Sequence, residues 1–282
     1  MENPENTRES VAFFRRSELF GVEMRTVNDT NRPWRCYATD FEFMAPITWK
    51  GEIWHRRRQA ILEPGMVLCA HPGEVFLARQ VLTPGSGSSL MVDPQVLADY
   101  VAEHDLPPAR LQLRSFTKMS DELSGKLTKL FQVLRPGSTA MELESSFVEF
   151  IAAMTGELVD QTSRALPPRA DSDWRAAERV RECLQHDTSA TIDLTSLANQ
   201  TGMSRFQALR AFKRRYGLPP HTYQLRVRLG LAQRSLREGL QPAHVAAEYG
   251  FVDQSHLTRH FKRLMGVTPA QYARIGTAAA SR

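Results

Sequence analysis

The sequence is poor in cysteine and has no long apolar run. Its three cysteines, Cys36, Cys69 and Cys183, are far apart, and no CxxC pair or paired histidine spacing suggests a tetrahedral metal site. No apolar segment approaches the roughly 20 residues that span a bilayer, and the chain starts with charged and polar residues. We therefore expect a cytoplasmic protein with reduced thiols, no metal or other cofactor, and no membrane partner.

Charge is unevenly distributed along the 282 residues. Residues 1–173 hold 19 Lys+Arg and 24 Asp+Glu, a net charge of −5, whereas residues 174–282 hold 17 against 7, a net charge of +10. A basic half is typical of proteins with a negatively charged partner, which is nucleic acid, a membrane surface or an acidic protein. The length allows two domains of ordinary size.

The N-terminal half changes its pattern at Asp93. From Gly21 to Asp93, β-branched and aromatic runs alternate with turn residues at about ten-residue spacing, which predicts a small β barrel or sandwich. The runs lie at 35–43, 49–62, 66–70 and 75–82. After Asp93, the sequence predicts helices over residues 94–104, 121–134 and 141–162.

The last of these helices has a single apolar stripe. Its members recur at three- and four-residue spacing: Leu143, Phe147, Phe150, Ile151, Met154 and Leu158. Periodicity does not tell whether such a stripe packs on the barrel or forms a dimer seam, and both remain open. The stretch 164–173 contains two prolines and no apolar period, so it is the predicted linker between domains 1–163 and 174–282.

The basic half contains an internal repeat. Its two copies are LANQTGMSRFQALRAFKRRYG, from Leu197, and VAAEYGFVDQSHLTRHFKRLMG, from Val245, with their FKR triplets 49 residues apart. Each copy predicts a short helix, a glycine turn, a capping residue and a second helix, which is helix-turn-helix order. The turn glycines are Gly202 and Gly250, and the capping residues are Ser204 and Asp253.

The second helix of each copy has two different faces. The face predicted to pack inward carries Ala208, Phe212 and Tyr216, or Leu257, Phe261 and Met265. The opposite face carries Phe206, Arg210 and Lys213, or Ser255, Arg259 and Lys262. Arginine can bond two acceptors on guanine, and lysine suits phosphate. A helix over residues 221–238, about 27 Å long at 1.5 Å per residue, joins the copies, so one chain can reach two grooves that lie ~34 Å apart.

These segments resemble the DNA-binding domain of the AraC/XylS family of bacterial transcription regulators. The likeness covers 174–274 and includes Gly266-Val267-Thr268-Pro269-x-x-Tyr272. It implies a regulator, usually an activator that works with RNA polymerase, that binds promoter DNA in two adjacent major grooves and has no catalytic residue. Two positions depart from the family: Ala208 replaces a core leucine and His260 an apolar residue.

The same resemblance implies contacts residue by residue. Base or groove contacts are expected from Arg205, Phe206, Gln207 and Arg210 in the first copy and from Gln254, Ser255, Thr258 and Arg259 in the second. Lys213 and Lys262 are expected to contact the DNA backbone.

The N-terminal half is similar to the cupin-like effector domain of this family. The likeness rests on Gly51-Glu52-x-Trp54, Leu62-Glu63-Pro64-Gly65 and Pro72-Gly73-Glu74, and it implies small-molecule binding, homodimerisation or both. The effector-binding candidates are Arg35, Tyr37, Trp54, Arg56 and His71. The predicted fold class is therefore α+β: an N-terminal cupin-like β barrel with helices, followed by an all-α domain with two helix-turn-helix units.

A metal-dependent oxygenase and a regulator without an effector pocket are the two alternatives to this function. A metal-dependent oxygenase normally presents a His-x-His pair, whereas the barrel region offers only His55 and His71 and no metal ligand set. Measured metal content separates that reading from a regulator. A regulator controlled by a protein partner or by abundance needs no effector pocket, and a thermal-shift screen with small molecules distinguishes it.

Overall fold

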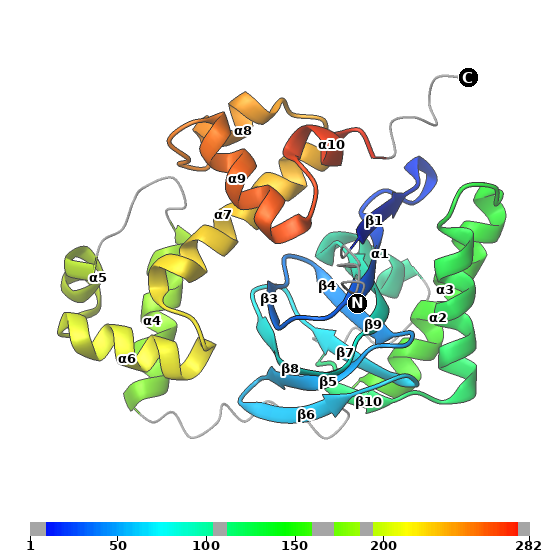
Figure 1. The fold of residues 1–282 in the computed structure, drawn as a ribbon, viewed down its shortest axis with the longest axis horizontal. Helices are drawn as coiled ribbons and strands as arrows, with labels where there is room; N and C mark the ends of the chain where they lie inside the picture. The colour runs from blue at the N-terminus through cyan, green and yellow to red at the C-terminus, as the bar shows by residue number, and fades with distance from the viewer. Residues whose placement is uncertain (1–9, 104–111, 160–171, 187–193, 276–282) are drawn as a thin grey trace, which may run out of the picture. The chain divides into compact units, whose positions relative to one another are not determined.

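The computed structural model describes residues 10–103, 112–159, 172–186 and 194–275. Backbone contacts divide the chain into two compact units, one rich in strands and one helical (Figure 1). The strands are β1 (Ser10–Arg15), β2 (Val22–Thr30), β3 (Trp34–Tyr37), β4 (Phe41–Pro46), β5 (Lys50–His55), β6 (Arg58–Leu62), β7 (Met66–Ala70), β8 (Val75–Thr83), β9 (Gly85–Val92) and β10 (Phe116–Lys118). The helices are η1 (Ser17–Leu19, a 3-10 turn), α1 (Pro94–Glu103), α2 (Asp121–Val133), α3 (Ala140–Leu158), α4 (Ser172–His186), α5 (Leu194–Thr201), α6 (Arg205–Tyr216), α7 (Pro220–Arg237), α8 (Pro242–Glu248), α9 (Gln254–Met265) and α10 (Pro269–Ala273).

The strand-rich unit contains two antiparallel sheets. The larger has the order β1-β2-β9-β4-β7-β10 and the smaller β3-β8-β5-β6. In the larger sheet, Met24, Leu90, Phe43 and Cys69 form one row across four strands, because each pairs with the next in register. All four side chains are buried on the face that the helices cover, so this row is the floor of the main core.

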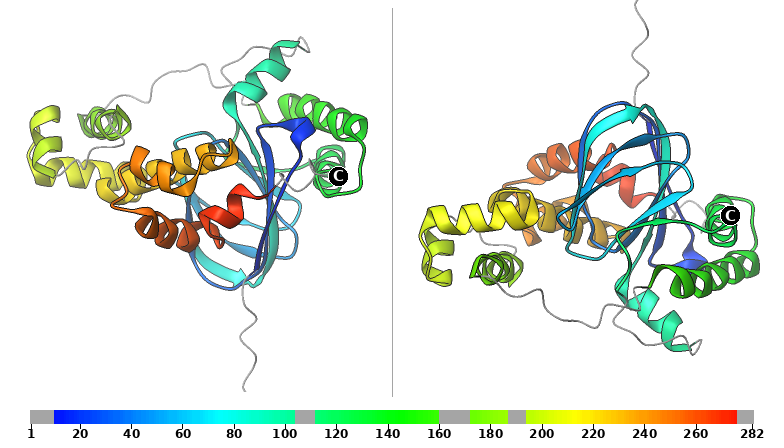
Figure 2. Two further views of the ribbon diagram at one scale, coloured as in Figure 1. Left: turned by 90° about the horizontal axis from the view of Figure 1, so that it is seen from above. Right: turned by 90° about the horizontal axis from the view of Figure 1, so that it is seen from below.

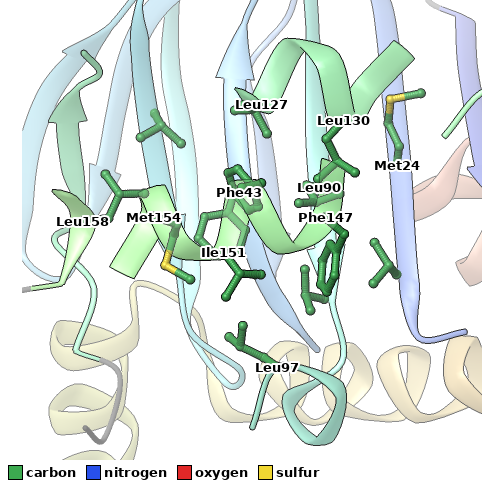
Figure 3. Close-up of a cluster of buried hydrophobic side chains, with 14 of the residues drawn as sticks. Met24, Phe43, Leu90, Leu97, Leu127, Leu130, Phe147, Ile151, Met154 and Leu158 are labelled. Atoms are coloured by element: carbon green, nitrogen blue, oxygen red, sulfur yellow. The ribbon is translucent and has the colours of Figure 1, made fainter. Parts of the chain in front are cut away.

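Helix α3 places its apolar stripe against that row. The six stripe residues, from Leu143 to Leu158, are at most 1% exposed, and Phe150 meets Phe43 edge to face at 5.4 Å between ring centroids. Figure 3 shows Phe147, Ile151 and Met154 of α3 in one buried cluster with Phe43 of the sheet. Helices α2 and α3 lie side by side along one side of the sheet (Figure 2). The stripe is therefore core, and the alternative that it forms a dimer seam is wrong.

A second core lies between the sheets. It joins Met44 and Leu68 of the larger sheet to Ile53 and Phe76 of the smaller one, together with Trp49. The two sheets remain separate, so the predicted barrel is an open, cupin-like double sheet. With the helical second unit, this confirms the predicted α+β class.

Two predicted strand runs are each a pair of strands. Residues 35–43 span most of β3 and the first half of β4, and residues 49–62 contain β5 and β6. The turn between β5 and β6 is formed by Arg56 and Arg57, with φ of 48° and 63°. Glycine, asparagine and aspartate are the usual residues at positive φ in hairpin turns, so two arginines gave no turn signal. Strands β1 and β10 lie outside the predicted β region, and β2 and β9 lie inside it but in none of the four predicted runs.

The helical unit is built around α7. Helix α4 packs on α5, α6 and α7, while α7 also contacts α8, α9 and α10. In Figure 1, α7 runs from the α4–α6 group to the α8–α10 group. The helix predicted at 221–238 is thus confirmed within one residue at each end. The predicted linker at 164–173 lies, except for its last two residues, outside the described residues.

Candidate nucleic-acid interface

The first helix-turn-helix consists of α5, a tight turn and α6. Gly202 ends α5 with φ of 67°, and the Met203 amide donates to the carbonyl of Ala198 (3.0 Å), which closes the helix end. Ser204 then caps α6: its hydroxyl accepts from the Gln207 amide, while the Gln207 side chain accepts from the Ser204 amide. The predicted glycine turn and cap are both confirmed.

The second helix-turn-helix repeats this arrangement with one extra residue. Gly250 has φ of 68°, and the Phe251 amide donates to the carbonyl of Ala246 (3.0 Å). Asp253 caps α9 by accepting from the His256 amide at 2.6 Å. Val252, 86% exposed, is the additional residue, because two residues separate Gly250 from Asp253 where one separates Gly202 from Ser204.

Helices α6 and α9 bury equivalent faces. Ala208, Phe212 and Tyr216 are buried in α6, as are Leu257, Phe261 and Met265 in α9. The opposite faces are open to solvent. The exposed residues are Arg205, Phe206, Gln207, Arg210 and Lys213 in α6 and Gln254, Ser255, Arg259 and Lys262 in α9, with Thr258 half-buried. The structure thus brings all ten predicted DNA contacts onto two exposed helix faces.

Helix α7 belongs to both bundles. Near its start, Tyr223 stacks edge to face on Phe212 (5.1 Å) and accepts a hydrogen bond from Gln185 of α4 (3.1 Å). In the second bundle, Tyr272 of α10 packs on Phe261 in the same way (5.4 Å). Gln233 of α7 donates to the Tyr272 hydroxyl (3.0 Å). The C-terminal half of α7 therefore holds the second bundle together through a glutamine–tyrosine hydrogen bond, as α4 does in the first bundle.

A buried arginine connects α7 to the second turn. Arg228 is 8% exposed and donates from Nη1 to the carbonyl of Gly250 at 2.8 Å. The hydroxyl of Ser235 in α7 is also hydrogen-bonded, at 2.7 Å, to the hydroxyl of Tyr249, the residue before Gly250. The sequence did not point to Arg228, because it is one of several arginines in the predicted helix 221–238 and nothing distinguishes it from the others. The structure shows it as the α7 side chain that holds the turn before α9.

Position N3 of each exposed helix is occupied by a side chain that folds back. Gln207 Oε1 accepts from the Ser204 amide (3.0 Å), and His256 Nδ1 accepts from the Val252 amide (3.3 Å). Both side chains therefore stabilise the start of their helix. The predicted base contact needs both the oxygen and the nitrogen of the Gln207 side-chain amide. The oxygen is already bonded to the Ser204 backbone amide.

Basic residues concentrate at the ends of the two exposed helices. The last turn of α6 carries Lys213, Arg214 and Arg215, and that of α9 carries Lys262 and Arg263. Cations at a helix C-terminus interact favourably with its dipole.

Burial, followed by the neighbouring His256 and nearby arginines, lowers the pKa of His260. His260 is thus a half-buried residue whose uncharged form is favoured, at a position where the family usually has an apolar residue.

Residue Gly202 offers a direct test of the turn geometry. No atom lies within 4 Å of where a Cβ would sit, so the cost of Gly202→Ala comes from the positive φ alone. We expect it to lower the free energy of unfolding by about 1–2 kcal/mol. Gly202→Asn, which tolerates this conformation better, is the matched control and should lose less. Urea denaturation of the two variants measures both, and equal losses would contradict this account.

The five predicted effector contacts do not share one environment. Arg35 is exposed next to the buried Cys36, and Trp54 stacks under the Arg79 guanidinium at 5.9 Å, so both face away from the core between the sheets. Tyr37 is half-buried. Arg56 and His71 both bind Leu113: Arg56 donates to its carbonyl (2.6 Å) and His71 Nε2 accepts from its amide (3.1 Å). Their assignment to an effector stays a prediction.

A charged cluster that the sequence did not predict lies on the face of the larger sheet that is turned toward the smaller sheet. Arg25 contacts Glu42 at 2.6 Å, and Arg15 contacts Glu23 at 3.2 Å, with side-chain exposures from 0 to 15%. The Cys36 thiol donates to Glu42 (3.6 Å). Burial, the largest single effect, lowers the pKa of Arg25, but Glu42, Cys36 and Glu23 together outweigh it, so the pKa is raised. Alternation with the buried Met24 and Phe43 is the signal that could have located these charges.

The described residues place limits on two other kinds of site. Among them, no three His, Cys, Asp or Glu side chains gather closely enough to hold a metal ion. Within the same ranges, no helix has the length and apolar character to cross a membrane.

The chain has clear relatives among known proteins. A family model described as a helix-turn-helix domain matches residues 197–275. An AraC-like transcription regulator of Streptomyces antibioticus is 34% identical over 219 residues, covering 74% of this chain and 67% of that protein. The transcriptional regulator YbfI of Bacillus subtilis (strain 168) is 26% identical over 205 residues, covering 71% and 72%.

A solved structure extends the likeness to the whole fold. The apo form of ToxT from Vibrio cholerae matches 93% of this chain and 99% of its own at a TM-score of 0.52, with 12% sequence identity. At that identity the match supports the fold alone, which is a cupin-like unit followed by a helical one. The Streptomyces antibioticus relative, 34% identical and matched over 67% of its length, shows that the chain belongs to the AraC family of transcription regulators, and the helix-turn-helix match agrees with this.

Proposed function

We propose that the protein activates transcription by binding promoter DNA with α6 and α9 in successive major grooves. One observation carries the proposal: Arg210 and Arg259 occupy equivalent, exposed positions on two helices that pack on the same α7. An arginine at this position of a groove-entering helix can bond O6 and N7 of guanine. The 18 residues of α7 correspond to about 27 Å at 1.5 Å per residue, a length suited to bridging two grooves ~34 Å apart.

The exposed residues fall into three roles under this proposal. Base contacts come from Arg205, Phe206 and Arg210 of α6 and from Gln254, Ser255, Thr258 and Arg259 of α9. Lys213 and Lys262, one turn further along, neutralise phosphates. Gln207 fixes the start of α6 through its capping bond and contributes to base contact only through its remaining amide group.

The strand-rich unit is proposed to regulate this binding as an effector-binding and homodimerisation domain, with RNA polymerase as the partner in activation. A thermal-shift screen with the full-length protein tests the effector, because a ligand at 100 times its Kd stabilises the folded state by about 2.7 kcal/mol. If no compound raises the melting temperature, control by a protein partner or by abundance is favoured.

DNA recognition is tested by selecting bound sequences from a random duplex pool with the full-length protein. We expect a motif of two short blocks about one helical turn apart. The affinity of the winning duplex should fall steeply with salt, because each phosphate contact releases counterions. If no motif emerges, the selection is repeated with residues 172–275 fused to a neutral carrier. Failure there as well would contradict the proposal.

A further inference from the structure

Phe206 is a large apolar side chain that the fold does not use. It is 69% exposed in the first turn of α6, between the charged Arg205 and the polar Gln207. The apolar side of the same helix is filled by Ala208, Phe212 and Tyr216 and does not include it. Leaving a phenylalanine in water forgoes the free energy of burying it. An exposed aromatic residue on the DNA-facing surface therefore calls for a binding role.

The two exposed helices differ in chemistry at equivalent positions. Position by position, α6 has Arg205, Phe206, Leu209 and Arg210 where α9 has Gln254, Ser255, Thr258 and Arg259. Leu209 and Thr258 are both half-buried at the edge of the exposed face. Arg210 matches Arg259 and Arg205 is replaced by Gln254, while the two middle positions are apolar in α6 and carry hydroxyls in α9. Two helices with the same geometry thus present different groups to DNA.

Apolar side chains have one partner among the base edges of the major groove. Thymine carries a C5 methyl group there, whereas the other groups presented by the four base pairs are hydrogen-bond donors and acceptors. Hydroxyl side chains instead bond to donors or acceptors of several bases. The pair Phe206 and Leu209 suits a methyl group, and the pair Ser255 and Thr258 does not require one.

We propose that Phe206, assisted by Leu209, recognises a thymine methyl group, so that the DNA block bound by α6 is identified by a methyl contact and the block bound by α9 by hydrogen bonds. The inference rests on the proposed function, in which both helices enter major grooves. Its consequence is an asymmetric site: the two blocks differ in sequence, and the protein binds them in one orientation.

Replacing thymine by uracil tests this, because it removes the methyl group and leaves base pairing intact. Each thymine of the selected duplex is replaced in turn, and the affinity of the full-length protein is measured. Within the block whose preference depends on Arg210, we expect at least one replacement to weaken binding about fourfold, the effect of losing one buried methyl-sized group. In the block that depends on Arg259, uracil should weaken binding less, because α9 offers only the methyl of the half-buried Thr258 there.

Phe206→Ser, which copies the residue of the second helix, is the decisive variant. Its side chain is exposed, so the substitution should leave the fold intact, and the melting temperature checks this. The variant should bind the thymine and uracil duplexes equally, whereas the matched control Ser255→Ala should retain the fourfold difference.

Three results would overturn the inference. These are a block for α6 without thymine, a uracil effect absent in the unmodified protein, or one that persists in Phe206→Ser. A variant that binds both duplexes normally but fails to activate transcription would assign Phe206 to a protein partner instead. If Arg210→Ala also leaves all base preferences unchanged, the proposed function fails together with the inference. If Arg210→Ala changes them, only the methyl assignment is lost.

Discussion

Arg210→Ala is expected to remove base discrimination in one block of the binding site, and Arg259→Ala in the other. Each arginine is exposed in the middle of a helix whose inner face is fixed by buried side chains, so its position is set by the fold. A two-pronged contact with guanine contributes about 1–3 kcal/mol of discrimination, or roughly 5- to 150-fold. The measurement is the affinity of each variant for duplexes mutated in one block at a time.

Lys213→Ala is the matched control for this pair of variants. Lys213 is exposed one turn beyond Arg210, so it should contact phosphate and contribute equally to all sequences. Its loss should weaken specific and random DNA alike and reduce the slope of affinity against salt by about one. Equal losses on specific and random DNA for both arginine variants would show that neither arginine contacts bases.

Arg228→Met is expected to impair the second block alone, although Arg228 lies on α7 and outside the DNA-facing surface. The substitution keeps the apolar stem but removes the donor to the Gly250 carbonyl. A fully buried carbonyl without its partner costs about 1–3 kcal/mol; the Gly250 carbonyl is part-buried, so we expect a loss at the lower end, which should loosen the turn that positions α9. We predict reduced discrimination in the Arg259-dependent block, with discrimination in the Arg210-dependent block retained.

General destabilisation must be distinguished from loss of positioning. Ser235→Ala removes a different hydrogen bond of the same helix, that to the Tyr249 hydroxyl, and leaves the Gly250 carbonyl in place. We expect it to lower the melting temperature while both blocks remain discriminated. Arg228→Lys, which restores a donor, should recover part of the second-block preference. If Ser235→Ala and Arg228→Met change discrimination equally at matched stability, Arg228 has no positioning role.

The helical unit could be predicted because its signals are local. Gly202 and Gly250 mark turns by their freedom at positive φ, and Ser204 and Asp253 mark helix starts by hydrogen bonds to residues three positions away. Such signals depend on a few neighbouring residues and are visible in sequence. The repeat strengthened them, because the same order of signals occurs twice.

The strand-rich unit was predicted less completely because its contacts are distant in sequence. The stripe of α3 has the same period whether it faces Phe43 or a second subunit, so only the fold could decide between them. The partners of the pair Arg25 and Glu42 are 17 residues apart on strands that are not neighbours in the sheet. Charged residues in strands are ordinarily taken as solvent-exposed, which hid this cluster. Gln207 likewise looked free until its bond to Ser204 was seen.

The central claim is that one chain holds two DNA-reading helices on the same side of the duplex through a shared α7. The most direct test inserts about five base pairs, half a helical turn, between the two blocks of the selected duplex. Because Tyr223 and Gln233 tie α7 into both bundles, we predict that affinity falls to that of a duplex with a single block. If affinity is unchanged by the insertion, the two helices bind independently, and the account is contradicted.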